Sequence, residues 1–182
     1  MLRRPDRWLA GVTLAEMLVV VAILSVVAAI AIPQASSVTP HVADAAAAEV
    51  AHAIRFAQRE ALRTGRYHVA EIDPAKQTIL VYRPGNSAAD PHMTVMHPVD
   101  KQQPYRIHLA GNTARAIVAS SVFTYGADKT SAIAFGPDGA PVNYAAGQVP
   151  MAPLSLDGIV SLQSGAALRT VIVDKTTGRV TL

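Results

Sequence analysis

The pattern of apolar and polar positions begins with one unbroken apolar run. It covers residues 12–32, VTLAEMLVVVAILSVVAAIAI, and its 21 residues include a single charge, Glu16. A helix of this length is about 32 Å long, which matches the apolar thickness of a bilayer. The run therefore predicts one membrane-spanning helix.

Residues 41–64 have the period of an amphipathic helix, with Gly65 as the expected C-terminal cap. Pro33 and Pro40 precede this helix. The sequence leaves open whether the two helical segments join through a kink or are broken, with Thr39 as an N-cap before Pro40. Small side chains form the predicted buried face: Ala43, Ala46, Ala47, Val50, Ala53, Ile54, Ala57 and Ala61.

Beyond Gly65 the period changes to that of β-strands. The polar stretch 83–104, which contains prolines, is typical of a long loop. A helical first part followed by a run of strands predicts an α+β fold. We expect seven or eight strands, mostly antiparallel, over residues 67–72, 77–82, 105–110, 116–125, 131–135, 158–164 and 168–174 and in a terminal hairpin at 174–182.

Composition and charge fit a membrane-anchored domain. Half of the residues are hydrophobic (51%) and only 16% are charged, which excludes a disordered chain, and the lack of cysteine excludes disulfides and thiol chemistry. Arg3, Arg4 and Arg7 precede the apolar run and place the N-terminus in the cytoplasm, with everything after Pro33 on the far side. A cleaved secretory signal peptide is the alternative. Neither a membrane anchor nor a signal peptide explains Glu16, because a carboxylate in the membrane costs about 2–3 kcal/mol without a partner.

The segment GVTLAEMLVVVAILSVVAAIAIP resembles the N-terminus of type IV prepilins and type II secretion pseudopilins. The resemblance implies that a prepilin peptidase cleaves after Gly11 and that Val12, where the family usually has phenylalanine, becomes the N-methylated first residue. Ala15 is a second departure, since the family has a larger aliphatic residue there. The resemblance also implies that four further residues serve assembly: Thr13, Leu14, Glu16 and Pro33.

In that family, the carboxylate at the position of Glu16 neutralises the terminal amine of a neighbouring subunit. Opposite charges attract strongly in a low dielectric, whereas either charge alone in lipid is penalised. Assembly would therefore be favoured over remaining in the bilayer. The alternative is that Glu16 interacts only with the N-terminus of its own helix.

The segments FAQREALRTGRYHVAEID, FGPDG and LRTVIVDKTTGRV resemble the GspH/FimT group of minor pilins. The implied fold is pilin-like: a long N-terminal α-helix, transmembrane in its first half, packed on an antiparallel β-sheet domain. The implied parts are a leader peptide (1–11), a transmembrane and assembly helix (12–33), a periplasmic half of the helical spine (34–64) and a β-rich globular domain (65–182).

The implied function is that of a minor pseudopilin in the pseudopilus of a type II secretion system. The alternatives are a FimT/FimU-like minor pilin of a type IV pilus and, from another class, a membrane-tethered β-domain receptor. Expected partners are the prepilin peptidase, other pseudopilins or pilins and the inner-membrane assembly platform. The expected location is the inner membrane, crossed once, with the globular domain in the periplasm.

No motif for catalysis or for a cofactor accompanies this pattern, so an enzyme is not expected. His92 and His97 do not share a helical face, and no metal site is expected. His68 and His108 lie in strand patterns, where we expect surface or satisfied edge residues. Three aspartates stand beside proline or glycine and are expected to form turns: Asp73, Asp138 and Asp157.

Two groups of basic residues raise the question of DNA. His52, Arg55, Arg59 and Arg63 line the face of the second helix opposite to its apolar face, which we interpret as a solvated stripe, with DNA or an acidic neighbour as the alternative. Some FimT-like pilins bind DNA through a C-terminal GRxR tail, where this chain has GRVT. Nucleic acid is therefore not expected as a partner, and the candidate contacts are Arg169, Lys175 and Arg179.

Overall fold

The computed structural model describes residues 13–31, 38–85, 92–109, 116–143 and 151–182. The chain divides into two compact units, with the boundary between Val38 and Thr39. Helix α1 (Leu14–Ala31) is the described element of the first unit. The second unit contains helix α2 (Val38–Thr64), which starts at the boundary, and all of the strands.

Helix α1 covers most of the apolar run, but its 18 residues are fewer than the 21 expected. Among the described residues, no helix has the length and apolar character that crossing a membrane requires. The membrane span therefore stays a prediction. Within α1 the Ser25 hydroxyl donates to the Val21 carbonyl at 2.7 Å, so the polar group in this apolar helix is satisfied internally.

Helix α2 begins at Val38, three residues earlier than expected. Thr39 therefore lies inside the helix and is not its N-cap, and Pro40 is in the first turn, where the missing N–H breaks no intrahelical bond. The helix ends as expected: Gly65 has a φ of +65° and donates its N–H to the Ala61 carbonyl at 2.9 Å. Residues 32–37, and with them the choice between kink and break, lie outside the described residues.

The strands form two antiparallel sheets. The first sheet has the order β3-β2-β1-β7-β8-β9, with β4 also paired to β2, and the second has the order β12-β11-β10-β5-β6. The strands of the first sheet are β1 (His68–Asp73), β2 (Thr78–Arg83), β3 (Met93–Thr94), β4 (Arg106–His108), β7 (Ala132–Phe135), β8 (Pro141–Asn143) and β9 (Ala152–Pro153). Those of the second are β5 (Ile117–Tyr125), β6 (Asp128–Thr130), β10 (Gly158–Ser164), β11 (Ala167–Val173) and β12 (Val180–Thr181).

The described residues thus contain twelve strands instead of the seven or eight expected. The additional ones have only two or three residues, too few to show a period of two in the sequence. The expected long loop at 83–104 is also partly wrong. It contains β3 and a bridge between Met96 and Pro104, and it packs on the end of β2.

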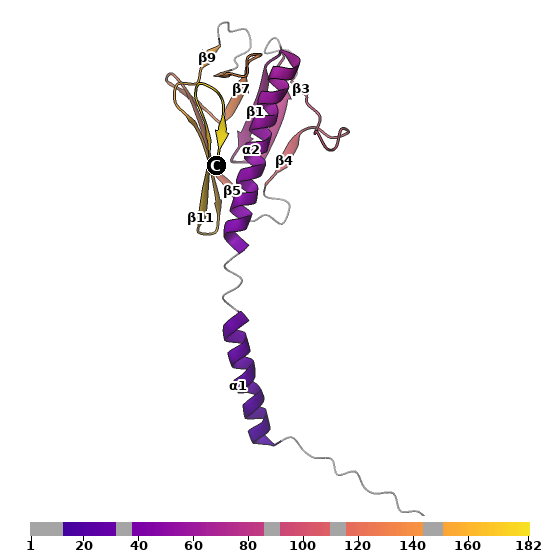
Figure 1. The fold of residues 1–182 in the computed structure, drawn as a ribbon, viewed down its shortest axis with the longest axis vertical. Helices are drawn as coiled ribbons and strands as arrows, with labels where there is room; N and C mark the ends of the chain where they lie inside the picture. Colours follow the sequence, from indigo (N-terminus) through magenta and orange to yellow (C-terminus); the bar gives the residue numbers. More distant parts are fainter. Residues whose placement is uncertain (1–12, 32–37, 86–91, 110–115, 144–150) are drawn as a thin grey trace, which may run out of the picture. The chain divides into compact units, whose positions relative to one another are not determined.

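One core joins α2 to both sheets (Figure 1). All eight residues of the predicted apolar face are buried, with no more than 2% of any side chain exposed. Most of them are alanines, so small side chains form the buried face of the helix. The antiparallel α+β fold is therefore confirmed, with α2 supplying the helix that packs on the sheets.

Polar contacts along α2 bind it to both sheets. Arg55 donates to the Val180 carbonyl of β12 at 2.9 Å. The Gln58 amide donates to the carbonyls of Gly139 and Thr177, both at 2.9 Å, which lie in the turns between β7 and β8 and between β11 and β12. Phe56 stacks on Tyr105, with ring centroids 4.7 Å apart.

Gln77 links the two sheets in a way that the sequence does not signal. It ends the turn between β1 and β2 with a φ of +53°. Its side-chain amide donates to the Val118 carbonyl at 3.0 Å and accepts from the Val118 N–H at 2.7 Å. Strand β6 pairs with β5 only over Phe123–Tyr125. Gln77 therefore bonds the backbone of Val118 in a part of that β5 edge with which no described strand pairs.

Candidate functional sites

The start of α1 holds the predicted assembly residues. Thr13 is the N-cap: its hydroxyl accepts the N–H of Glu16 at 3.3 Å. Glu16 is therefore in the first turn, where a carboxylate also interacts favourably with the helix dipole. Leu14 and Glu16 are exposed. Gly11, Val12 and Pro33 lie outside the described residues, so cleavage, methylation and the role of the proline stay predictions.

The surface of α1 is apolar on all sides. Every described side chain from Leu14 to Ala28 is exposed, and the large aliphatic ones include Leu18, Val21 and Leu24 at 59–63% exposure. An exposed apolar surface of this extent is unfavourable in water and marks a region that binds lipid or protein.

The basic stripe on α2 is only partly solvated. His52 and Arg59 are exposed, as expected. Arg55 is half-buried because it bonds to β12, and Arg63 forms a salt bridge with Glu60 at 2.7 Å. The stripe therefore contributes to packing as well as to the surface charge.

The three candidate DNA contacts do not form one cluster. Arg169, near the start of β11, pairs with Asp44 on α2, and the hydrogen bond from Arg169 lowers the pKa of the Asp44 carboxyl. Lys175 and Arg179 lie beyond the other end of β11. There the carboxylate of Asp174 accepts from the backbone N–H groups of Thr176 and Thr177.

The turn-forming aspartates behave largely as expected. The Asp73 carboxylate accepts the N–H groups of Ala75 and Lys76 within its own turn, at 2.9 and 3.0 Å. Asp138 accepts from Ala140 in the same manner at 3.1 Å. Asp157 instead accepts the N–H of Lys175, which ties two separate turns together. No group of metal-binding side chains occurs within the described ranges.

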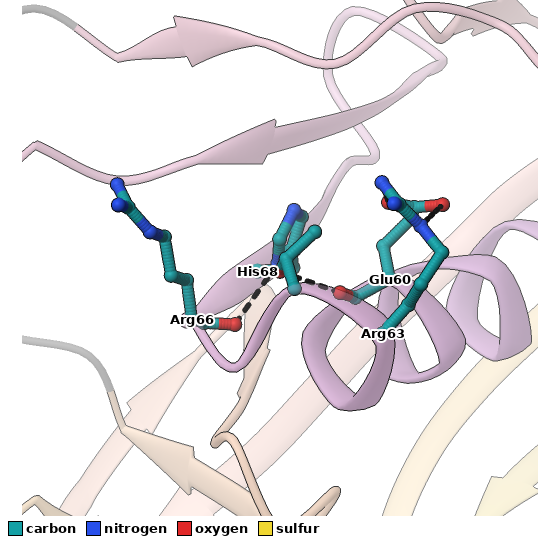
Figure 2. Close-up of polar contacts among 5 residues, drawn as sticks. Glu60, Arg63, Arg66 and His68 are labelled. Carbon is teal, nitrogen blue, oxygen red and sulfur yellow. Dashed lines mark hydrogen bonds and ion pairs between the residues drawn. The ribbon is translucent and has the colours of Figure 1, made fainter.

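A hollow of about 390 Å³ lies at the C-terminal end of α2, between that helix and the ends of β1, β2 and β3. Figure 2 shows polar residues at this end of α2, with Glu60 and Arg63 side by side and the His68 ring on the Arg66 carbonyl. Arg83 lies on the wall formed by β2, next to Met93 of β3. The apolar part of the lining is Phe56, Met93, Val95 and Met96.

His68 corrects one expectation. We expected a surface or edge residue, but β1 lies between β2 and β7, and only 3% of His68 is exposed. The expectation that it is satisfied is confirmed by the contact of its Nδ1 with the Arg66 carbonyl at 3.0 Å. Burial lowers the pKa of His68 below its usual value, so the ring is neutral at neutral pH. His108, in β4, is exposed as expected.

The outer face of the second sheet is uncharged over β5, β10, β11 and β12. Val122, Ile159 and Ile172 lie opposite one another on three neighbouring strands and are 38–45% exposed. Ser161 and Thr170 form the next row, and Gln163 with Leu168 the row after it. This face therefore has a row of apolar side chains beside rows of mostly polar, uncharged ones.

These features define a class of protein: an α+β, pilin-like domain in which one helix packs along two antiparallel sheets, preceded by a separate apolar helix. The family model of the type II transport protein GspH matches residues 46–177, which is well over half of the chain. The chain belongs to this GspH family, and the membership predicted from the sequence is confirmed.

The comparison with solved structures supports this fold through one of the two described below, the minor pseudopilin EpsH. The minor pseudopilin EpsH from the type 2 secretion system of Vibrio cholerae has a TM-score of 0.51 and 11% sequence identity, over 77% of this chain and 94% of that one. The type IV minor pilin FimU of Pseudomonas aeruginosa has a TM-score of 0.45 and 14% identity, over 77% of this chain and 87% of that one. No curated protein sequence matches the chain.

Proposed function

We propose that this protein is a minor pseudopilin, a structural subunit of the periplasmic pseudopilus of a type II secretion system, and not an enzyme. The observation that carries the proposal is the GspH family match over residues 46–177. Two further observations support the proposal. The fold is shared with a minor pseudopilin, and the N-terminal segment is of the prepilin type.

The proposed maturation starts in the inner membrane. The apolar residues 12–32 anchor the chain there, with Arg3, Arg4 and Arg7 on the cytoplasmic side and the β domain in the periplasm. A prepilin peptidase cleaves after Gly11, and the new amine on Val12 is methylated. The exposed apolar surface of α1 supports this placement, because lipid or neighbouring subunits would cover it.

Glu16 is the proposed assembly residue. Glu16 is exposed, so its carboxylate is accessible to a charged partner. In the proposed filament that partner is the terminal amine of an adjacent subunit. The assembly platform would extract the subunit from the bilayer, where the unpaired carboxylate is penalised, into a bundle where the two charges neutralise each other.

A deletion strain tests the proposed machine. Loss of the gene is expected to leave secreted enzymes in the periplasm, and the wild-type gene should restore their export, whereas a Glu16→Ala variant should not. Normal secretion together with loss of twitching or of DNA uptake would refute the type II assignment. It would favour the alternative function, a FimT/FimU-like minor pilin, which would use the same N-terminal segment.

A further inference from the structure

We propose that the hollow at the C-terminal end of α2 is a docking site for an acidic peptide segment of a partner protein. The site consists of two guanidinium groups, one imidazole nitrogen and an apolar wall, all contributed by the second unit. The segment it fits carries a glutamate or aspartate next to an apolar residue.

The polar part of the hollow is arranged to receive a carboxylate. Arg63 and Arg83 line it from α2 and from β2, against a single lining carboxylate, that of Glu60. Glu60 and Arg63 occupy each other, because Arg63 donates to both Glu60 oxygens at 2.7–3.1 Å, so the positive charge without a carboxylate in the lining is that of Arg83. Among the described residues the Arg83 guanidinium bonds to the uncharged sulfur of Met93 and to no carboxylate, so its charge is available for an anion.

His68 adds a directional group to the floor. Its Nδ1 faces the Arg66 carbonyl, which can only accept, so in the neutral ring the proton is on Nδ1 and Nε2 carries the lone pair. His68 lines the hollow although only 3% of the residue is exposed. In the neutral ring Nε2 can only accept a hydrogen bond, so it bonds to a carboxylate once the ring takes up a proton.

Phe56 holds one side of the apolar wall in place before any ligand arrives. Phe56 is stacked on Tyr105, which is itself 4% exposed and in contact with the His97 ring at 4.9 Å. Met93 and Met96 are 47% and 48% exposed on the opposite side. Flexible methionines on an open site adapt to the apolar residue of a bound peptide.

Binding should strengthen as the pH falls toward the pKa of His68. The charged groups that face this ring are Glu60 and Arg63 from α2 and Arg83 from β2, with Arg66 immediately before β1, and β3 contributes none. Because a bound carboxylate favours the imidazolium, binding takes up a proton, and affinity rises at lower pH.

The test is calorimetric titration of the full chain in mild detergent with the peptide acetyl-Gly-Glu-Leu-Glu-Gly-amide and with its glutamine counterpart. We expect only the acidic peptide to bind, more tightly at pH 6 than at pH 7.5, and to shift the His68 ring signals in NMR spectra. Arg83→Gln should weaken binding about tenfold, since one charge-assisted hydrogen bond is lost. Glu60→Gln should strengthen it, because Arg63 is released.

Arg59→Gln is the matched control, because Arg59 is an exposed arginine of α2 outside the hollow and its loss changes the net charge equally. It should change the affinity by less than about twofold. If Arg83→Gln fails to fold, Arg63→Gln takes its place. No binding at about 1 mM peptide, equal binding of both peptides, or equal effects of Arg59→Gln and Arg83→Gln would overturn the proposal. Displacement by acetate at concentrations equal to those of the peptide would identify a small-anion site instead.

Discussion

Removing the Gln77 side chain tests how the two sheets are held together. The Gln77→Ala variant loses both hydrogen bonds to Val118, a residue that is only 2% exposed. A buried backbone group left without a partner costs about 1–3 kcal/mol, and Gln77 itself is half-buried, so water replaces part of the loss. We therefore expect the free energy of unfolding to fall by about 2–4 kcal/mol.

The backbone of Gln77 supplies a second, opposite effect. Its φ of +53° is unfavourable for any residue with a Cβ, by about 1 kcal/mol, and natural for glycine. Gln77→Gly should therefore be about 1 kcal/mol less destabilising than Gln77→Ala, although both lose the same hydrogen bonds.

Urea denaturation of the full chain in mild detergent, followed by circular dichroism, measures these differences. Gln163→Ala is the control, because the Gln163 amide makes one local, exposed bond to the Gly165 carbonyl at 3.0 Å. It should cost less than about 0.5 kcal/mol. If Gln77→Ala were no more destabilising than Gln163→Ala, the described link between the sheets would not contribute to stability, and the reasoning would be wrong.

Three further predictions concern the rest of the chain. Glu16→Gln should be processed normally but enter filaments poorly, as measured by immunoblots of sheared filament fractions. Incorporation at the wild-type level would indicate that Glu16 interacts only with the N-terminus of its own helix. Burial lowers the pKa of His68, so its contribution to stability is present above the unfolded-state pKa and is lost as the pH falls. Urea midpoints between pH 7.5 and 5 should therefore fall less in His68→Gln than in the wild type, whereas exposed His108→Gln should follow the wild type. Ala57→Leu should cost about 1–3 kcal/mol, because Ala57 is fully buried between α2 and the sheets, and an unchanged urea midpoint would show that the core is looser than described.

Local patterns made much of this fold predictable from the sequence. The alanine-rich face of α2 is buried as its period indicates, and the hairpin of β1 and β2 forms at the predicted turn. Both depend on residues close in sequence. The division into two sheets depends instead on residues far apart in sequence, because pairing with distant segments fixes the two- and three-residue strands.

The candidate sites were less predictable for the same reason. Arg169 meets Asp44 across 125 positions of sequence, and Gln77 meets Val118 across 41. His68 is buried because the end of α2 and the strands β2 and β7 surround it, which the alternating pattern of its own strand does not reveal. The prepilin-type segment was recognisable because its chemistry lies in consecutive residues.

The N-terminus of the protein purified from cells with an active prepilin peptidase tests the central claim most directly. Mass spectrometry should find a chain that begins at Val12, with a methyl group on its amine, and an uncleaved chain in cells that lack the peptidase. A chain that still carries residues 1–11 in the presence of the peptidase would contradict the account, because Glu16 would then have no neighbouring amine to neutralise.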